Sequence, residues 1–402
     1  MPRSSSFSSV AEPKTQWLEV ILLWIAGVSA AMQFAKFSIS FDTLLSHYDM
    51  GATSTGAALS AVGLAGLIFG VSAGMIASRV GYLKVLVGAL LLGGTLSLIQ
   101  SRLPSFDFLL ITRLLEGFSQ LGVVVTAPTL IAKLSAPQHR SLTMGLWGTF
   151  FGVAFAVSGW IGKGLLDNLG LQAVFLGHSL LIFTMGIVLF FMLRKHPVLN
   201  LLPVTGTQAG FLTQMLQVYR NPRSLLPSCV FLFYTFTLVS VLTYVPSLVG
   251  NASLTAWMLI VLPLVSTCGT FLAGAIAQYV MKPQRVALLA YSGVAVGISC
   301  AFVMSGTAWI FFMAIGVVVL CLGMVSGSSL AMIPILARSP NEQAQSYGLL
   351  AQFGNLGGTI GPPAFATAIA TYGLSGLVVL VLCVCVCGVS FSVLSGRIQT
   401  AS

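Results

Sequence analysis

The sequence predicts an all-α membrane protein in which twelve transmembrane helices form two similar six-helix bundles. Composition, the spacing of apolar runs and the placement of basic residues support this prediction. Of the 402 residues, 57% are apolar and only 6% are Asp, Glu, Lys or Arg, whereas about 25% of the residues in a typical soluble domain are charged. The 42 glycines fit the same class, because helices in a membrane associate through small residues that let their backbones approach closely. So little charge leaves no room for a sizeable soluble domain.

The apolar runs are long enough to cross a bilayer, which takes about 20 helical residues. The first run follows a polar stretch, residues 1–16, and exceeds the apolar core of a signal peptide, so we predict a spanning helix there. A linker (195–223) and a tail (396–402) leave an N-terminal bundle (17–194) and a C-terminal bundle (224–395). The predicted crossings are 17–40, 54–77, 84–101, 107–130, 142–164, 172–193, 224–246, 254–279, 286–304, 309–336, 344–370 and 375–395.

Basic residues test the number of crossings, because they favour the cytoplasmic loops of membrane proteins. With both termini in the cytoplasm, Arg102 and Lys163 lie near the outer side, and Lys36 and Arg113 lie inside helices. The other 14 fall on the cytoplasmic side: Arg3, Lys14, Arg79, Lys84, Lys133, Arg140, Arg194, Lys195, Arg220, Arg223, Lys282, Arg285, Arg338 and Arg397. A missed helix would scramble this separation. We therefore expect a multi-pass protein of the inner (cell) membrane, and we attribute the net charge of +10 to this placement and not to nucleic-acid binding.

All seven cysteines lie in apolar runs of the second half, where we expect them to act as small packing residues. Cys383, Cys385 and Cys387 have the spacing of a metal motif, but on a helix they point in different directions and no histidine or acid accompanies them. We expect neither a metal nor a cofactor.

Three short segments recur about half a chain apart and in the same order, which indicates two related halves. Residues 73–77 match 273–277, and residues 144–150 match 347–353. Between them, Pro128 and Pro334 precede similar short sequences.

Arg113 and Glu116 stand inside the otherwise apolar run 107–130. A charged side chain at the centre of a bilayer costs about 2.5 to 3.5 kcal/mol on insertion scales and usually marks a functional pathway. The two residues share one helix face. Arg113 supplies a permanent positive charge beside which Glu116 could gain or lose a proton. The alternative is that the pair neutralises itself and only makes the helix insertable.

Two motifs resemble those of the major facilitator superfamily of transporters, over residues 17–395. Gly74, Arg79 and Gly81 match the cytoplasmic signature after the second helix, although Ser78 replaces its acid. Arg113, Glu116 and Gly117 resemble the signature of the fourth helix. The resemblance implies two halves around a central cavity, an arginine that faces this cavity and takes part in coupling, and a gating role for the first motif. Arg79 could equally be a positive anchor on the inner side.

The glycine series that antiporters of the superfamily carry in the fifth helix is incomplete, because Trp160 replaces its proline. A glycine-proline element occurs instead in the eleventh helix, at Gly361 and Pro362. With Gly117 and Pro128, these residues would allow the close contact and bending that moving halves need. Static packing is the alternative.

Further polar residues in the spans are candidates for substrate binding. Gln33 and Lys36 share a face of the first helix; Lys36 points either into the cavity or, by snorkelling, toward the lipid headgroups. His178 is a packing residue or a proton carrier. In the second half we single out Tyr244, Gln352 and Asn355, although such polar groups can also bond their own helix. The first half would then carry charge coupling and the second half substrate shape.

These observations predict a secondary active transporter that moves a small or medium organic solute by alternating access. We expect proton coupling through Glu116 and Arg113, and an anionic substrate because Lys36 and Arg113 outnumber Glu116. A diffuse resemblance to the cyanate-transporter-like branch points the same way. We expect a monomer whose partners are the solute, protons and membrane lipids.

The alternatives are proton-antiport efflux of amphiphilic drugs or metabolites, favoured by 26 Phe and 14 Met, and a receptor without transport. The sequence argues against a receptor, because it offers no extramembrane domain that could carry a signal. An enzyme is not expected, because the sequence shows no catalytic triad, metal cluster or phosphate loop.

Overall fold

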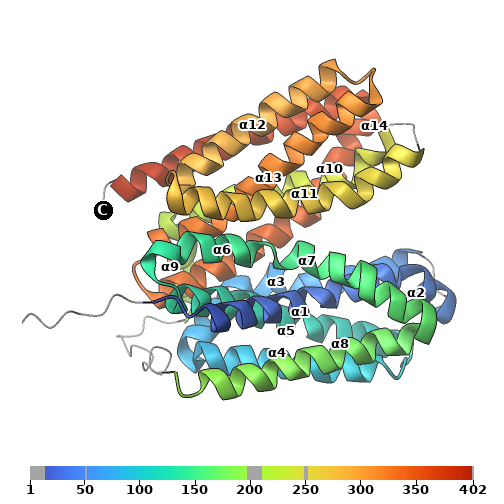
Figure 1. The fold of residues 1–402 in the computed structure, drawn as a ribbon, viewed down its shortest axis with the longest axis vertical. Coiled ribbons are helices and arrows are strands. Elements are labelled where there is room, and N and C mark those ends of the chain that lie inside the picture. The colour runs from blue at the N-terminus through green and yellow to red at the C-terminus, as the bar shows by residue number, and fades with distance from the viewer. Residues whose placement is uncertain (1–13, 50–51, 197–210, 249–251, 401–402) are drawn as a thin grey trace, which may run out of the picture.

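The computed structural model describes residues 14–49, 52–196, 211–248 and 252–400, and within these ranges all regular structure is helical. Figure 1 shows two helical bundles side by side, one from each half of the chain. The predicted fold class is confirmed.

The first bundle contains six crossings. The first four are single helices: α1 (Trp17–Ile39), α3 (Ala52–Val80), α4 (Tyr82–Gln100) and α5 (Phe106–Leu134). The fifth is assembled from the short turn η1 (Pro137–His139), α6 (Arg140–Gly148), α7 (Phe150–Val157), the π-helical η2 (Ser158–Gly162) and the start of α8 (Lys163–Leu193). The chain turns back at Gly170, whose φ of 81° lies in the region that favours glycine. The rest of α8 is the sixth crossing.

The second bundle repeats this plan with α10 (Pro222–Tyr244), α11 (Ala252–Tyr279), α12 (Pro283–Val303), α13 (Ala308–Leu336) and α14 (Pro340–Thr400). Helix α14 holds two crossings, because its backbone breaks at Gly373, with a φ of 61°. Ten continuous stretches of the described chain are long and apolar enough to span a membrane, and two of them fold back at Gly170 and Gly373. The chain therefore crosses twelve times, as predicted.

Three short helices lie between the crossings and were not predicted: α2 (Phe41–Tyr48), α9 (Phe211–Arg220) and η3 (Pro246–Leu248). Helix α9 lies in the predicted linker, and α10 already begins at Pro222. Asn221 caps α10 by accepting a hydrogen bond from the backbone N–H of Arg223, and Pro222 occupies the first helical position, where its fixed φ suits a helix start.

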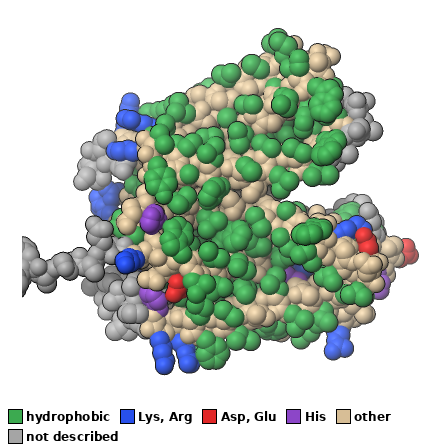
Figure 2. Space-filling view, viewed as in Figure 1, with side chains coloured by type: hydrophobic (Ala, Val, Ile, Leu, Met, Phe, Trp, Pro, Cys, Tyr) green, Lys and Arg blue, Asp and Glu red, His purple; other side chains and the backbone are tan. Residues whose placement is uncertain are grey.

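One end of the molecule, which we call the linker end, carries the first described residues, α9 and the C-terminus of α14 (Figure 1). Here the halves touch through glycines. A Cβ atom on Gly348 would lie 2.2 Å from the backbone oxygen of Gly70, and one on Gly145 would lie 2.6 Å from the Cα of Gly274. At the opposite end, which we call the open end, Figure 2 shows a deep hollow between the two bundles.

Candidate functional site

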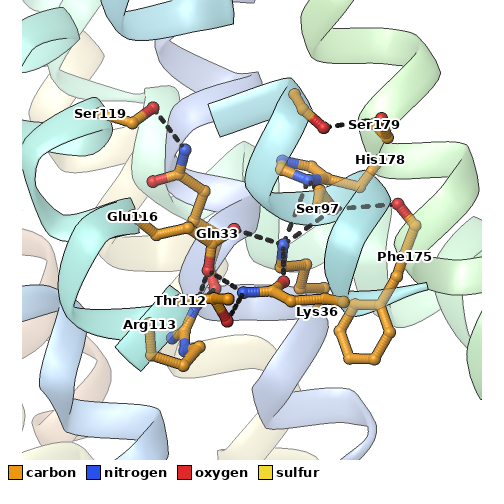
Figure 3. A network of polar contacts seen from close by, with 12 residues as sticks. Gln33, Lys36, Ser97, Thr112, Arg113, Glu116, Ser119, Phe175, His178 and Ser179 are labelled. Atoms are coloured by element: carbon orange, nitrogen blue, oxygen red, sulfur yellow. Dashed lines mark hydrogen bonds and ion pairs between the residues drawn. The ribbon is translucent and has the colours of Figure 1, made fainter. Parts of the chain in front are cut away.

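A cluster of three charged side chains lies inside the first bundle (Figure 3). Glu116 on α5 accepts from both neighbouring cations: its Oε1 is 2.5 Å from Lys36 Nζ on α1, and its Oε2 is 2.5 Å from Arg113 Nη1. The side chains of Lys36, Arg113 and Glu116 are 2%, 0% and 0% exposed. This charge cluster therefore holds two cations and one anion away from water.

Neutral polar groups of α4 complete the hydrogen bonds of the charge cluster. Gln100 accepts from Lys36 Nζ at 2.8 Å and donates to Glu116 Oε2 at 2.9 Å, and it also donates to Thr112. Ser97 accepts from Lys36 Nζ at 3.0 Å and donates to the carbonyl of Phe175. Because buried polar groups are costly when unpaired, these partners are what allows the charges to remain inside the bundle.

His178 on α8 borders the charge cluster. Its Nε2 lies 2.9 Å from the carbonyl oxygen of Ser29, which can only accept, so Nε2 must carry a hydrogen. In the neutral ring Nδ1 is then the unprotonated nitrogen. It lies 3.4 Å from Lys36 Nζ and 2.9 Å from Ser97 Oγ, whose one hydrogen goes either to Nδ1 or to the Phe175 carbonyl. The histidine thus presents a proton acceptor to the lysine.

Arg113 is held by the backbone of two other helices. Its Nε donates to the carbonyl of Ala58 on α3, and its Nη1 donates to the carbonyl of Gln33 on α1. The guanidinium also lies 3.9 Å from the centre of the Phe37 ring, a distance at which cation–π attraction is effective. The arginine therefore ties α1, α3 and α5 together.

A cavity of about 390 Å³ lies between the two halves. Aromatic rings from both halves line it, including Phe34, Trp147, Phe150, Phe231 and Tyr234. Its polar side chains are all uncharged: Ser60, Gln120, Thr235, Ser326, Asn355 and Thr359. Within the described residues, no Asp, Glu, Lys or Arg lines this central cavity.

The charge cluster and the central cavity are separate but share two helices. On α1, the side chain of Gln33 donates a hydrogen bond to Ser119 inside the first bundle, whereas the next residue, Phe34, lines the cavity. On α5, Ser119 accepts this hydrogen bond, whereas the next residue, Gln120, lines the cavity. A displacement of either helix would therefore move residues of both the charge cluster and the central cavity.

The sequence profile of the Major Facilitator Superfamily matches residues 23–362. The chain belongs to the Major Facilitator Superfamily. The predicted membership is thereby confirmed, together with the expectation that a member of this superfamily of transporters is not an enzyme.

Relatives within the superfamily match this chain over part of their length. A 4-hydroxybenzoate transporter, PcaK of Pseudomonas aeruginosa, is 26% identical over 181 residues, which cover 45% of this chain and 40% of the relative. A gallate transporter of Pseudomonas putida is 27% identical over 167 residues, 41% of this chain and 37% of the relative. The matches thus span about two-fifths of the length of these relatives. The structure of FucP of Escherichia coli in its outward conformation shares the fold, with a TM-score of 0.73 at 13% identity over 94% of this chain and 98% of that one.

The predicted substrate-binding residues of this superfamily member are not all at its cavity. Asn355 on α14 lines the cavity and approaches Gly66 of α3. Gln352 does not line it; its amide donates to the carbonyl of Leu67 and accepts from the Tyr219 hydroxyl. Tyr244, the last residue of α10 at the open end, is also absent from the lining.

Gln33, Lys36 and Arg113 differ most from the sequence-based expectation. We expected Arg113 to face the central cavity, named Gln33 and Lys36 as candidates for substrate binding, and left Lys36 between the cavity and the headgroups. Each is buried inside the first bundle and none lines the cavity. Lys36 does not snorkel either, because its ammonium points to Glu116. The correction concerns position. Glutamate, lysine and arginine satisfy one another inside the bundle, where removing any one partner would leave an uncompensated buried charge. Their roles stay predictions.

The predicted gating residues lie at contacts between helices. A Cβ on Gly74 would lie 2.6 Å from the backbone oxygen of Ala344, so this glycine permits the contact of α3 with α14 at the linker end. Arg79 donates to Gln214 of α9, and Gly81 turns the chain with a φ of 106°. Ser78, where the motif has an acid, bonds its own helix at Met75.

The other predicted conformational residues are packed within one half. A Cβ on Gly117 would lie 2.6 Å from the backbone oxygen of Val62, and one on Gly361 would lie 2.3 Å from that of Phe236. Pro128 lies inside α5, and Pro362 lies in the part of α14 before its break at Gly373. Their predicted part in movement stays a prediction.

Sequence reasoning missed Ser97, Gln100 and most of the aromatic cavity lining. Gln100 had a usable signal, because it is an amide inside the run 84–101 and would have been found by searching every span for polar residues. The rings of the cavity had none, since the chain contains 26 Phe and only the packing of helices decides which of them face inward.

Proposed function

We propose that this protein transports a small aromatic solute across the membrane by alternating access, coupled to protons. The observation that carries the proposal is the central cavity, which lies between the two halves and is lined by aromatic rings. The two halves are in close contact at the linker end, and a hollow separates them at the open end. We propose that the cavity opens to one side of the membrane at a time, as alternating access requires.

The lining of the cavity favours a flat solute with a few hydrogen-bonding groups. Aromatic pairs prefer offset-stacked or edge-to-face arrangements, and rings approach from the first half, at Phe150, and from the second half, at Phe231 and Tyr234. Asn355 and Gln120 could bond hydroxyl or carboxylate oxygens. The relatives named for 4-hydroxybenzoate and gallate suggest hydroxylated aromatic acids, which also meets the expectation of an anionic solute.

Coupling to protons is proposed from the charge cluster. Ionisable residues inside a membrane are rare and mark ion or proton pathways. Arg113 is the fixed cation and Glu116 the ionisable partner predicted from the sequence. Because α1 and α5 carry residues of both the charge cluster and the cavity, a change in protonation and a change in occupancy act on the same helices.

The proposed setting is the inner membrane, with the linker end in the cytoplasm. Thirteen of the fourteen basic residues expected on that side lie in the described part of the chain, around the linker end, and the multi-pass architecture is plain from the fold. We further propose that the monomer is the functional unit, because the cavity and the charge cluster are both built within one chain.

The uncharged lining also favours a second candidate, proton-driven efflux of neutral amphiphilic compounds. The two candidates differ in whether a carboxylate on the solute is required. One comparison of an acid with its neutral analogue separates them.

Counterflow in proteoliposomes tests the proposed function. We expect radiolabelled 4-hydroxybenzoate to be exchanged, xylose not to be, and 4-hydroxybenzyl alcohol to be exchanged poorly because it lacks the carboxylate. Phe231→Ala should slow the exchange by removing one aromatic wall, whereas Phe191→Ala, at a ring that is 57% exposed on the outside of the first bundle, should not. Exchange of the alcohol and not the acid would favour efflux of neutral compounds, and exchange of neither would contradict an aromatic solute.

A further inference from the structure

The charge cluster carries one more positive than negative charge. Facing Lys36 are Glu116 and Arg113 from α5 and His178 from α8, whereas α4 contributes only the neutral Ser97 and Gln100. Helices α7 and η2 contain no ionisable residue, the ionisable residues of α3 and α6 stand at the linker end, and His47 of α2 packs on Tyr48. Lys36 and Arg113 thus share one carboxylate, that of Glu116.

Glu116 is poorly placed to take up a proton. Both of its oxygens already accept hydrogen bonds, Oε1 from Lys36 and Oε2 from Arg113 and Gln100. A proton on either oxygen would face these donors and would remove the negative charge that both cations contact. Such a state is strongly disfavoured in a low-dielectric interior.

Of the two cations, only the lysine can lose its proton. An arginine in a protein stays protonated, whereas a buried lysine loses its proton readily. If Lys36 becomes neutral, the ion pair between Arg113 and Glu116 remains. The amine would still donate two hydrogen bonds, enough for Glu116 and Gln100.

The nearest acceptor for that proton is His178. An ammonium has three hydrogens, and Glu116, Gln100 and Ser97 take them at 2.5, 2.8 and 3.0 Å. The fourth neighbour, Nδ1 of His178 at 3.4 Å, bears the lone pair because Nε2 donates to the carbonyl of Ser29. Transfer would leave a neutral amine and an imidazolium that still donates to Ser29, and the imidazolium would then release the proton to water.

We propose that Lys36, and not Glu116, is the group that gains and loses the coupled proton, with His178 as its first acceptor. The proposal rests on the proton coupling proposed above and assigns that coupling to a different residue from the one that the sequence suggested. Glu116 then stays ionised throughout and holds the two cations in place.

Lys36→Arg is the decisive variant, because a guanidinium keeps the charge but does not release a proton. Proteoliposomes with a gradient of one pH unit are loaded with labelled 4-hydroxybenzoate; one proton per solute limits accumulation to about tenfold, the ratio that matches about 1.4 kcal/mol. We expect the wild type to accumulate the solute and Lys36→Arg to reach a ratio of only about 1 while still performing counterflow. Lys84→Arg, the same change at an exposed lysine, is the control and should accumulate like the wild type.

Accumulation by Lys36→Arg would overturn the assignment to lysine while leaving the proposed function intact. A wild type that accumulates nothing under the pH gradient, yet performs counterflow, would overturn the proton coupling and this proposal with it. The two failures are therefore distinguishable in one set of vesicles.

Infrared difference spectroscopy of the wild type gives an independent reading that needs no variant at Lys36. Spectra are compared at about pH 6 and about pH 9, both above the range near pH 4 in which exposed carboxyls titrate. We expect no C=O band of a protonated carboxyl group. If the wild type shows such a band and Glu116→Gln does not, the protonated group is Glu116 and the proposal is contradicted.

Discussion

At the scale of single residues, Trp147 shows how the aromatic wall of the cavity is held. Its ring is 1% exposed and stacks on Phe150, with the ring centres 4.6 Å apart. The edge of its ring lies against Gly27 of α1, where a Cβ atom would come within 2.4 Å of the ring. The absence of one methyl group on α1 therefore sets the position of two rings that line the cavity.

Gly27→Ala should weaken transport of the aromatic solute. A ring cannot bend away as a flexible chain would, so Trp147 has to shift against Phe150 toward the cavity and narrow it. We expect a several-fold higher solute concentration for half-maximal uptake, measured as initial rates in proteoliposomes. Gly88→Ala, where an added Cβ meets nothing within 4 Å, should behave as the wild type; equal effects of both changes would contradict this account.

At the scale of helices, the linker end is closed by α3 against α14 and braced by α9. Val218 of α9 is buried in a cluster with Val71 and Met75 of α3 and Leu349 of α14. The Tyr219 hydroxyl donates to Gln352, whose amide donates to the carbonyl of Leu67. The helix between the two bundles thus contacts both of them where they meet, and it favours the state in which this end is shut.

Gly348→Ala should open the linker end. The added Cβ would lie 2.2 Å from a backbone oxygen of Gly70, which cannot move without moving α3, so the closed contact is disfavoured. We expect spin labels at Lys84→Cys and Lys282→Cys, in a background without the seven native cysteines, to report a longer distance across this end. Gly316→Ala, with nothing within 4 Å, is the control. An unchanged distance distribution in Gly348→Ala would show that the contact does not set the closed state.

At the scale of the whole molecule, the charged side chains of the described residues are confined to the two ends and to one buried cluster. Large apolar side chains cover much of the face shown in Figure 2, as expected where lipid chains surround a protein, and most Lys and Arg side chains gather at the linker end. Lys163 and Asp167 form an ion pair near the open end. Their i, i+4 spacing places both side chains on one face of the helix. This separation of charge sets the expected orientation in the membrane.

Cysteine accessibility tests this orientation. In intact cells an impermeant maleimide should label Arg102→Cys, an exposed position near the open end, because the proposed topology places that end outside. Lys84→Cys, exposed at the linker end, should react only after permeabilisation. The reverse pattern would place the linker end outside and contradict the proposed topology.

The sequence by itself determined the class of fold and the number of crossings. Apolar length, the basic residues and the three recurring segments depend on local composition, and a membrane makes local composition decisive because each span must bond its own backbone. The same logic placed Arg113 and Glu116 on one helix face. It also missed α2 and α9, which are too short to show an apolar run of spanning length.

Tertiary structure alone decided where the charges go. Lys36 meets Glu116 across 80 positions of sequence and Gln100 meets Lys36 across 64, and no periodicity within a helix reports such distant pairs. Packing α1, α4, α5 and α8 together turned polar residues from four separate helices into one buried cluster, and only aromatic and uncharged side chains line the cavity. Charges in an apolar interior are stable only beside their partners, so the packing of four helices, and not the spacing along any one of them, separated the charge cluster from the cavity.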